Sequence, residues 1–255
     1  MVKLSWRPDI EGLRAVAVLL VIAAHIGTPS LAGGFVGVDV FFVLSGYLIT
    51  ALLTQELRMT GRIDFWMFYA RRFRRLAPGL LLMLSVVCLF VAFALSPLRH
   101  PDQASASASA SVWASNFYFA FRDMDYFGAE AVSNLFLHTW SLGVEEQFYL
   151  VWPLLLWLIF SGFRPADTET SALRRLKTSM ALFFFVSLAL CLWLTRAHPA
   201  SAFYMMPARA WQFSLGALVW LTSPPPPPSL VPSCPPDCSG TCLAGLAFCS
   251  LCWRH

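Results

Sequence analysis

The stretch FVGVDVFFVLSGYLITALL occupies residues 35–53 and carries a single charged side chain, that of Asp39. A helix of this length extends about 28 Å, at 1.5 Å per residue, and so matches the hydrocarbon core of a lipid bilayer. A half-buried helix or strand of a soluble domain would show polar positions at regular intervals, and this run does not. The stretch therefore predicts a transmembrane helix.

The composition predicts several such helices. The chain has 255 residues, of which 58% are hydrophobic and only 13% charged, and its mean hydropathy is +0.63. These values exclude an ordinary soluble enzyme and a disordered regulator. Apolar segments lie at about residues 10–27, 35–53, 78–95, 148–163, 180–194 and 211–221. We predict an all-α, polytopic transmembrane helix bundle with about six spans, of which the last two are short for a bilayer.

The basic residues predict the orientation of the bundle. The net charge is +4, but Lys and Arg gather in short clusters between the apolar segments, as topology signals do, so no nucleic-acid partner is expected. With a cytoplasmic N-terminus, thirteen Lys and Arg residues lie on the cytoplasmic side and four on the opposite side. We therefore expect a multi-pass membrane protein with a cytoplasmic N-terminus. Residues 98–146 then lie outside the cytoplasm, and their Ala–Ser alternation at 104–111 is compatible with a weak helix or a tether.

Residues 223–255 differ in composition from residues 1–222. An unbroken proline run, Pro224 to Pro228, cannot supply the backbone hydrogen bonds of a membrane helix. Five cysteines follow, at positions 234, 238, 242, 249 and 252, with gaps unlike the paired C-x₂-C arrangement of a zinc site. We expect a membrane domain over 1–222 and a Pro/Cys-rich tail that is disordered or derived from a shifted reading frame, with no bound metal.

Two ionisable side chains share one face of the first apolar segment. Arg14 and His25 are eleven residues apart, which amounts to three full helical turns plus about 20° and to about 16 Å along the axis. The arginine can hold an anionic group, and the histidine can accept a proton from a hydroxyl. In the alternative interpretation, Arg14 extends to the membrane interface and His25 bonds a backbone carbonyl.

Asp39 and the arginines of residues 71–75 are candidates for substrate binding. The carboxylate of Asp39 can orient a histidine or bind a cation; alternatively it is an interfacial residue near a loop. The sequence Arg71-Arg72-Phe73-Arg74-Arg75 lies in the basic section 55–76, expected as a loop. There Arg72 and Arg75 can grip the phosphates of a nucleotide-like donor, although topology fixing and anionic lipid binding are rival roles.

His138 and Glu145 precede the fourth apolar segment. They are seven residues apart and would stack on one face of a helix, where the carboxylate can act as an acid, a base or a histidine orienter. Alternatively, Glu145 and Glu146 mark a helix N-terminus and offset its macrodipole. The chain contains no P-loop, GxSxG, HExxH or glycine-rich dinucleotide motif.

Four features together give the chain its resemblance to a known family. They are the Arg14-x₁₀-His25 spacing, GVDVFFVLSGYLIT at 37–50, FYARRFRRLAP at 68–78 and HTWSLGVEEQFYLVWP at 138–153. In this order they resemble the membrane acyltransferase-3 family of bacteria, over about residues 6–221. The resemblance implies a bundle of about ten spans, of which this chain would hold about the first six. It also implies O-acetylation of extracytoplasmic glycans such as lipopolysaccharide, peptidoglycan or another polysaccharide.

The resemblance also implies roles for single residues. Arg14 and His25 would be the paired functional residues of the first span, with His25 as base or transient acyl carrier. Arg72 and Arg75 would engage the phosphates of acyl-CoA, which would be a co-substrate rather than a bound cofactor, and Glu145 would be an active-site group. We therefore expect an acyltransferase of the bacterial inner membrane whose partners are acyl-CoA, a glycan acceptor and the bilayer. The alternative hypothesis is an inactive truncated remnant or a non-catalytic glycan or lipid carrier.

Overall fold

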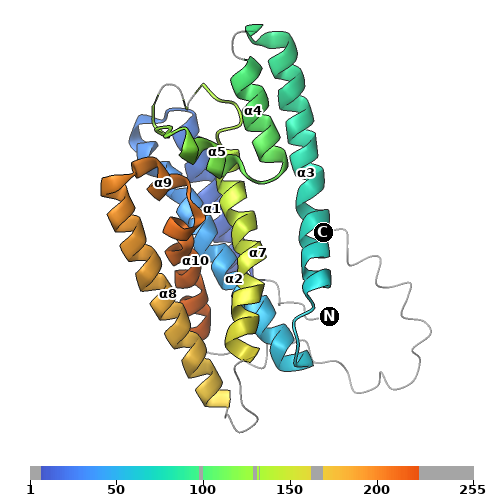
Figure 1. The fold of residues 1–255 in the computed structure, drawn as a ribbon, viewed down its shortest axis with the longest axis vertical. Coiled ribbons are helices and arrows are strands. Elements are labelled where there is room, and N and C mark those ends of the chain that lie inside the picture. Colours follow the sequence, from blue (N-terminus) through green and yellow to red (C-terminus); the bar gives the residue numbers. More distant parts are fainter. Residues whose placement is uncertain (1–6, 98–99, 129–130, 132, 162–168, 224–255) are drawn as a thin grey trace, which may run out of the picture. The chain divides into compact units, whose positions relative to one another are not determined.

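A computed structural model describes residues 7–97, 100–128, 131, 133–161 and 169–223. Within these ranges the chain is helical and forms no strand, which confirms the predicted all-α bundle (Figure 1). The helices are α1 (Pro8–His25), the 3₁₀ helix η1 (Pro29–Phe35), α2 (Val36–Thr60), α3 (Phe65–Ala94), α4 (His100–Ser111), α5 (Ser115–Phe121), α7 (Thr139–Ser161), α8 (Glu169–Ala197), α9 (Pro199–Tyr204) and α10 (Met206–Thr222). The proline run and the cysteine cluster of the predicted tail lie outside the described residues.

Six long helices occupy the positions of the six predicted apolar segments. Four of these regions are long and apolar enough to cross a membrane: Gly33–Thr60, Phe65–Ala94, Thr139–Ser161 and Ser171–Ala197. The first helix, α1, carries Asp9, Glu11 and Arg14 within 18 residues, and α10 has only 17 residues. Membrane crossing by α1 and α10 therefore stays a prediction.

Two segments expected to lie between spans are helical. The arginines of residues 71–75 belong to α3, which begins at Phe65 because Asp64 caps it by accepting a hydrogen bond from the Met67 backbone N–H at 3.0 Å. The Ala–Ser alternation forms α4, in which Ser105 and Ser109 donate to the carbonyl oxygens four residues earlier. The expectation of a basic loop over 55–76 was wrong in most of its length, because α2 runs on to Thr60 and leaves only residues 61–64 as a connection.

Glycine allows the central helices to approach closely. A Cβ at Gly46 of α2 would overlap the Phe213 carbonyl oxygen of α10, and a Cβ at Gly216 would overlap that of Val43. Phe213 stacks on Phe42 at 4.8 Å and on Phe148 of α7 at 4.0 Å between ring centroids. These contacts make α2, α7 and α10 the core of the bundle.

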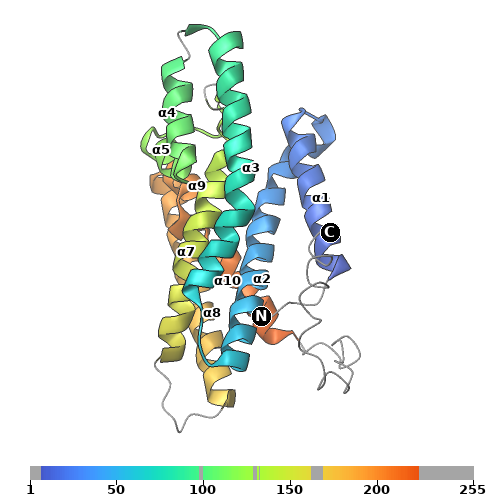
Figure 2. The same ribbon diagram turned by 90° about the vertical axis from the view of Figure 1, so that its right-hand side faces the viewer.

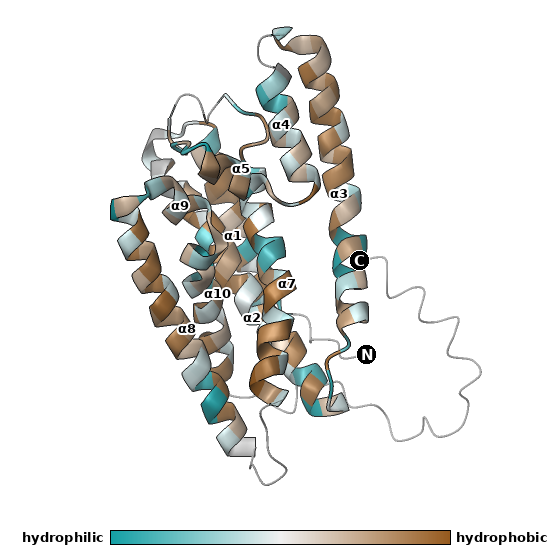
Figure 3. Ribbon diagram, viewed as in Figure 1, coloured by the Kyte–Doolittle hydropathy of each residue, from teal (hydrophilic) through white to brown (hydrophobic). Residues whose placement is uncertain are grey.

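The outer helices expose apolar side chains. Helix α1 packs on α2 and η1, as Figure 2 shows. Long stretches of α3 and α8 are apolar, interrupted by polar turns (Figure 3), and side chains such as Leu82, Phe93 and Trp193 are more than half exposed. Exposed apolar faces of this length are those that a lipid bilayer covers.

Candidate active site

Glu145 lies inside a helix rather than at its beginning. The fourth apolar segment was expected to start at Phe148, but α7 begins at Thr139, so Glu145 occupies the second turn. At this position the carboxylate is away from the free backbone N–H groups of the first turn, and the macrodipole interpretation does not hold. An ionisable group within an apolar helix is costly and needs polar partners.

Two hydroxyl groups provide those partners. Ser45 of α2 and Tyr149, one turn further along α7, both donate hydrogen bonds to Oε1 of Glu145. The two hydroxyl oxygens are 3.2 Å apart, and both residues are buried. Two hydrogen-bond donors thus converge on one carboxylate oxygen of Glu145, and this fixes the position of the side chain at this point of the bundle.

Arg72 brings a positive charge to the same cluster. Its guanidinium carbon lies 4.4 Å from the centroid of the Tyr149 ring, and its charge interacts with the carboxylates of Glu145 and Glu146. Glu146 is half-buried, and its Oε1 has no hydrogen-bond partner among the described residues. The structure thus brings together Arg72 and Glu145, two residues predicted from the sequence, into what we call the Glu145 cluster: Ser45, Arg72, Glu145, Glu146 and Tyr149.

Arg75 does not join this cluster. It follows Arg72 by three residues on α3, yet its side chain is exposed whereas that of Arg72 is half-buried. Helix α3 therefore presents Arg72 to the bundle and Arg75 to the surroundings. An anionic ligand could still contact both, because each extends from the same helical turn.

Arg14 lies on the stripe of α1 that faces α2. Ile10 and Ala17, one turn to either side, are buried, and the Ala17 carbonyl packs against Gly37 of α2. The Arg14 side chain is 25% exposed, and Nη1 is 3.5 Å from Oε1 of Glu11. Its Nε atom is buried and has no hydrogen-bond partner in the described part of the chain.

His25 lies in the last turn of α1 and is exposed. Its Nδ1 is 2.8 Å from the carbonyl oxygen of Val21, as the alternative interpretation expected. A carbonyl only accepts, so in the neutral imidazole Nδ1 carries the proton and Nε2 keeps its lone pair. The backbone contact therefore fixes the tautomer in which Nε2 can accept a proton, and the structural and the catalytic interpretations of His25 are compatible.

His138 lies immediately before α7, close enough to His25 for their charges to interact. Burial of the imidazole lowers the pKa of His138, a hydrogen bond with the backbone of Leu135 opposes this, and the positive charge of His25 lowers the pKa further. Part of the residue surface nevertheless stays exposed. His138 and Glu145 do not stack as predicted, because the helix begins only after His138.

Asp39 pairs with a cation that the sequence did not single out. Its Oδ1 accepts hydrogen bonds from Nη1 of Arg209 at 2.9 Å and from Nε2 of Gln212 at 2.8 Å, both on α10. Arg209 also donates from Nε to the Phe203 carbonyl oxygen at 2.9 Å. This pair joins the first turn of α2 to the first turn of α10, so Asp39 holds two helices together.

The sequence analysis singled out neither Ser45 nor Tyr149, and it did not pair Arg209 with Asp39. Tyr149 had a usable signal, because it follows Glu145 by four residues and so shares its helix face. Arg209 had a weaker one, because a cation in an apolar segment needs an anion and Asp39 was an unpaired candidate. Among the described residues, no group of three or more His, Cys, Asp or Glu side chains is placed to hold a metal.

Comparison with known proteins gives consistent matches. A family model described as an acyltransferase domain, acyltransferase-3, matches residues 7–230. O-acetyltransferase OatA of Staphylococcus aureus (strain NCTC 8325 / PS 47) is 41% identical over 162 residues, which cover 64% of this chain and 26% of the relative. Peptidoglycan O-acetyltransferase OatA of Listeria monocytogenes is 34% identical over 224 residues, covering 85% of this chain and 34% of the relative.

A further relative is the putative peptidoglycan O-acetyltransferase YrhL of Bacillus subtilis, which is 34% identical over 216 residues, or 84% of this chain and 33% of the relative. The chain thus spans about a quarter to a third of the length of these relatives. No solved structure matches it.

Proposed function

Because the chain belongs to the acyltransferase-3 family, we propose that it is a membrane O-acetyltransferase that transfers an acetyl group from acyl-CoA to a hydroxyl of peptidoglycan. Two of the relatives are named for peptidoglycan, which favours this acceptor over lipopolysaccharide. The proposal places the protein in the bacterial cell membrane with its N-terminus in the cytoplasm, where acyl-CoA is supplied.

The observation that carries this proposal is the Glu145 cluster within an apolar bundle. Each ionisable group inside a membrane costs a few kcal/mol, so a half-buried arginine beside two carboxylates indicates a function or a specific pairing. Oε1 of Glu145 accepts hydrogen bonds from two hydroxyl groups, and its carboxylate interacts with the charge of Arg72. Oε1 of Glu146 is buried and has no hydrogen-bond partner among the described residues. In such a site Arg72 can hold an anionic donor, and the carboxylate of Glu145 can accept a proton beside it.

The reaction assigns separate tasks to the predicted residues. Arg72 and Arg75 bind the phosphates of the donor, and Arg14 supplies a further cation on the α2-facing side of α1. Nε2 of His25 accepts the proton of the acceptor hydroxyl while the oxygen of that hydroxyl attacks the thioester carbonyl of the donor. The carbon–sulfur bond then breaks, and the departing thiolate takes up a proton to leave as coenzyme A. In a second form of the scheme, His25 carries the acetyl group before the hydroxyl attacks.

The test replaces Glu145 by glutamine, which keeps the side-chain shape and removes the charge. The chain is expressed in a bacterium that lacks peptidoglycan O-acetylation, and ester-linked acetate is released from purified peptidoglycan by mild base. We expect the unmodified chain to add acetate and Glu145→Gln to lower the amount about 100-fold. Asp102→Asn, the same chemical change on an exposed residue of α4, should leave it unchanged.

Equal membrane levels of the two variants are verified by labelling the chain. Full acetylation by Glu145→Gln would show that the Glu145 carboxylate is not needed for the reaction. Absence of acetate with the unmodified chain would reject the proposed activity itself.

A further inference from the structure

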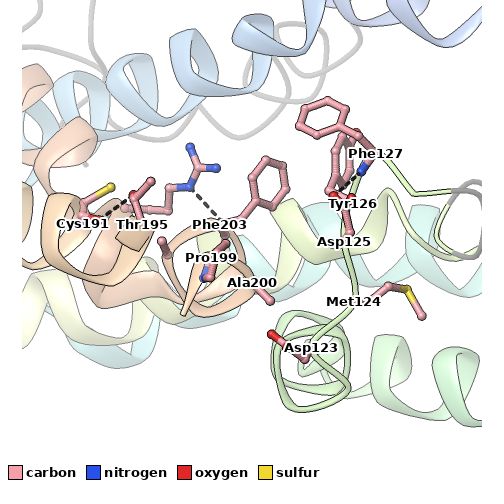
Figure 4. A pocket seen from close by; sticks show the side chains of 12 residues that line it. Asp123, Met124, Asp125, Tyr126, Phe127, Cys191, Thr195, Pro199, Ala200 and Phe203 are labelled. Carbon is pink, nitrogen blue, oxygen red and sulfur yellow. Dashed lines mark hydrogen bonds between the residues drawn. The ribbon is translucent and has the colours of Figure 1, made fainter. Parts of the chain in front are cut away.

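A pocket opens between the segment after α5, the end of α8, α9 and the start of α10 (Figure 4). Its volume is about 610 Å³, which lies in the range of pockets that hold small molecules. None of the residues predicted from the sequence lines it. Its lining includes Asp123, Asp125, Tyr126, Phe127, Phe203 and Arg209.

Aromatic rings form one wall of this pocket. Tyr126 stacks on Phe203 with ring centroids 4.5 Å apart, and Trp140 lies against Phe203 at 4.7 Å. The faces of the Phe203 ring are covered by Tyr126 and by the guanidinium of Arg209, which lies 4.6 Å from the ring centroid, whereas the Phe127 ring lines the same pocket and is 60% exposed. The face of an aromatic ring carries partial negative charge, and the C–H groups on one face of a pyranose ring carry partial positive charge. A rigid aromatic wall is therefore suited to a sugar ring, which presents both an apolar face and a rim of hydroxyl groups.

The polar lining carries a net negative charge. Asp123 and Asp125 are exposed toward the pocket, and Oδ1 of Asp125 accepts the Phe127 backbone N–H at 3.0 Å. The charge of Arg209 is compensated by Asp39, and its Nε is bonded to the Phe203 carbonyl. Carboxylates accept hydrogen bonds from hydroxyl groups but repel phosphates, so the pocket favours an uncharged polyol over coenzyme A.

The pocket lies at the end of the bundle where α1 finishes. Phe127 contacts the ring of Phe35, the last residue of η1, at 5.2 Å, and η1 follows α1 closely in the chain. Trp140, which touches Phe203, follows His138 by two residues, and His138 interacts electrostatically with His25. The pocket thus adjoins the histidines rather than the arginines of α3.

We propose that this pocket binds one uncharged pyranose ring of the acceptor glycan, with the sugar face on the exposed ring of Phe127 and its hydroxyl groups on Asp123 and Asp125. The assignment rests on the proposed function, since it names the acceptor subsite of that reaction. It divides the two substrates between the two ends of the bundle, with the glycan at the pocket and the phosphates of the donor at the arginines.

The first test measures binding alone and needs no acetyl transfer. The full chain in lipid nanodiscs is titrated with a β-1,4-linked N-acetylglucosamine tetrasaccharide, and binding is followed by the change in tryptophan fluorescence, to which Trp140 beside the pocket contributes. We expect saturable binding that weakens about tenfold in Phe127→Leu, which removes the exposed aromatic face but keeps an apolar side chain. Phe121→Leu, on an 81% exposed ring outside the pocket, should bind like the unmodified chain.

Asp123→Asn provides a second variant that is expected to fold. Asp123 has a backbone φ of 50°, a conformation that asparagine adopts at least as readily as aspartate. We expect weaker tetrasaccharide binding in this variant as well. Unchanged binding in both variants, no binding by the unmodified chain, or displacement of the tetrasaccharide by coenzyme A alone would overturn the assignment.

The second test separates this assignment from the proposed function. Where acetyl transfer is measured, Phe127→Leu should raise KM for the glycan about tenfold and leave KM for acyl-CoA unchanged. A rise in KM for acyl-CoA alone would contradict the assignment and leave the proposed function standing. Tetrasaccharide binding without any acetyl transfer would support the pocket and reject the enzyme.

Discussion

The ion pair between Asp39 and Arg209 predicts a large effect on stability. The two side chains are 30% and 13% exposed, so the pair is largely removed from water. Replacing Arg209 by glutamine leaves the Asp39 carboxylate with the single hydrogen bond from Gln212 and also removes the bond to the Phe203 carbonyl. Breaking a buried pair in this way costs about 3–5 kcal/mol.

Because Asp39 keeps some access to water, we expect the lower end of that range, about 3 kcal/mol. For a chain of this size each kcal/mol lowers the midpoint temperature by about 2–4 °C, so Arg209→Gln should lower Tm by about 6–12 °C. Samples in detergent are heated to a series of temperatures and separated by size exclusion. The fluorescence of a label attached to the chain gives the amount of folded protein that remains at each temperature. Arg122→Gln, which breaks an exposed ion pair with Asp102, should change Tm by no more than about 2–4 °C.

A double variant identifies the pair as the cause. Asp39→Asn combined with Arg209→Gln leaves no unpaired charge, so its loss of stability should be smaller than the sum of the two single losses by about 1–3 kcal/mol. Single losses that add without any coupling would refute the reasoning, and so would a wild-type Tm for Arg209→Gln.

Two further predictions concern packing and acid stability. Gly216→Ala should lower Tm by about 5 °C or more in the same unfolding measurement, because its Cβ would overlap the Val43 carbonyl and separate α10 from α2; Gly79→Ala, at a position with open space, should not. The pKa of His138 is lowered in the folded chain, so the unfolded chain binds the proton first and stability should fall as pH drops through about 6.5. His138→Gln should flatten this acid limb in unfolding curves recorded between about pH 7.5 and 5.5, and an unchanged limb would contradict it.

The lengths of the apolar segments predicted which parts of the chain are helical, but not the residues at which the helices begin. Hydropathy located the apolar stretch before Ser96 and Pro97, yet the amphipathic turns that begin α3 at Phe65 carry arginines and were assigned to a loop. The local signal for this start is Asp64, which caps the helix. Polar turns also precede the apolar part of α7, so this helix begins at Thr139 and not at Phe148. Glu145 therefore lies inside the helix and not at its end.

The relative direction of two side chains was predictable where one helix held both residues. Arg14 and His25 share a helix, so their spacing alone fixes their relative direction. Glu145 and Arg72 lie on different helices, and their proximity depends on how α3 packs beside α7, which no spacing in the sequence encodes. Asp39 found its partner 170 positions later, and such a pairing emerges only from the packing of α2 against α10.

The role of His25 as proton acceptor is tested most directly by acetyl transfer in membrane vesicles. Vesicles containing the full chain receive radiolabelled acetyl-CoA and soluble peptidoglycan fragments, and base-labile label on the glycan is counted. We predict transfer by the unmodified chain and by His198→Ala, an exposed histidine at the start of α9, and a loss of about 100-fold or more in His25→Ala at equal protein level. Undiminished transfer by His25→Ala would contradict this account.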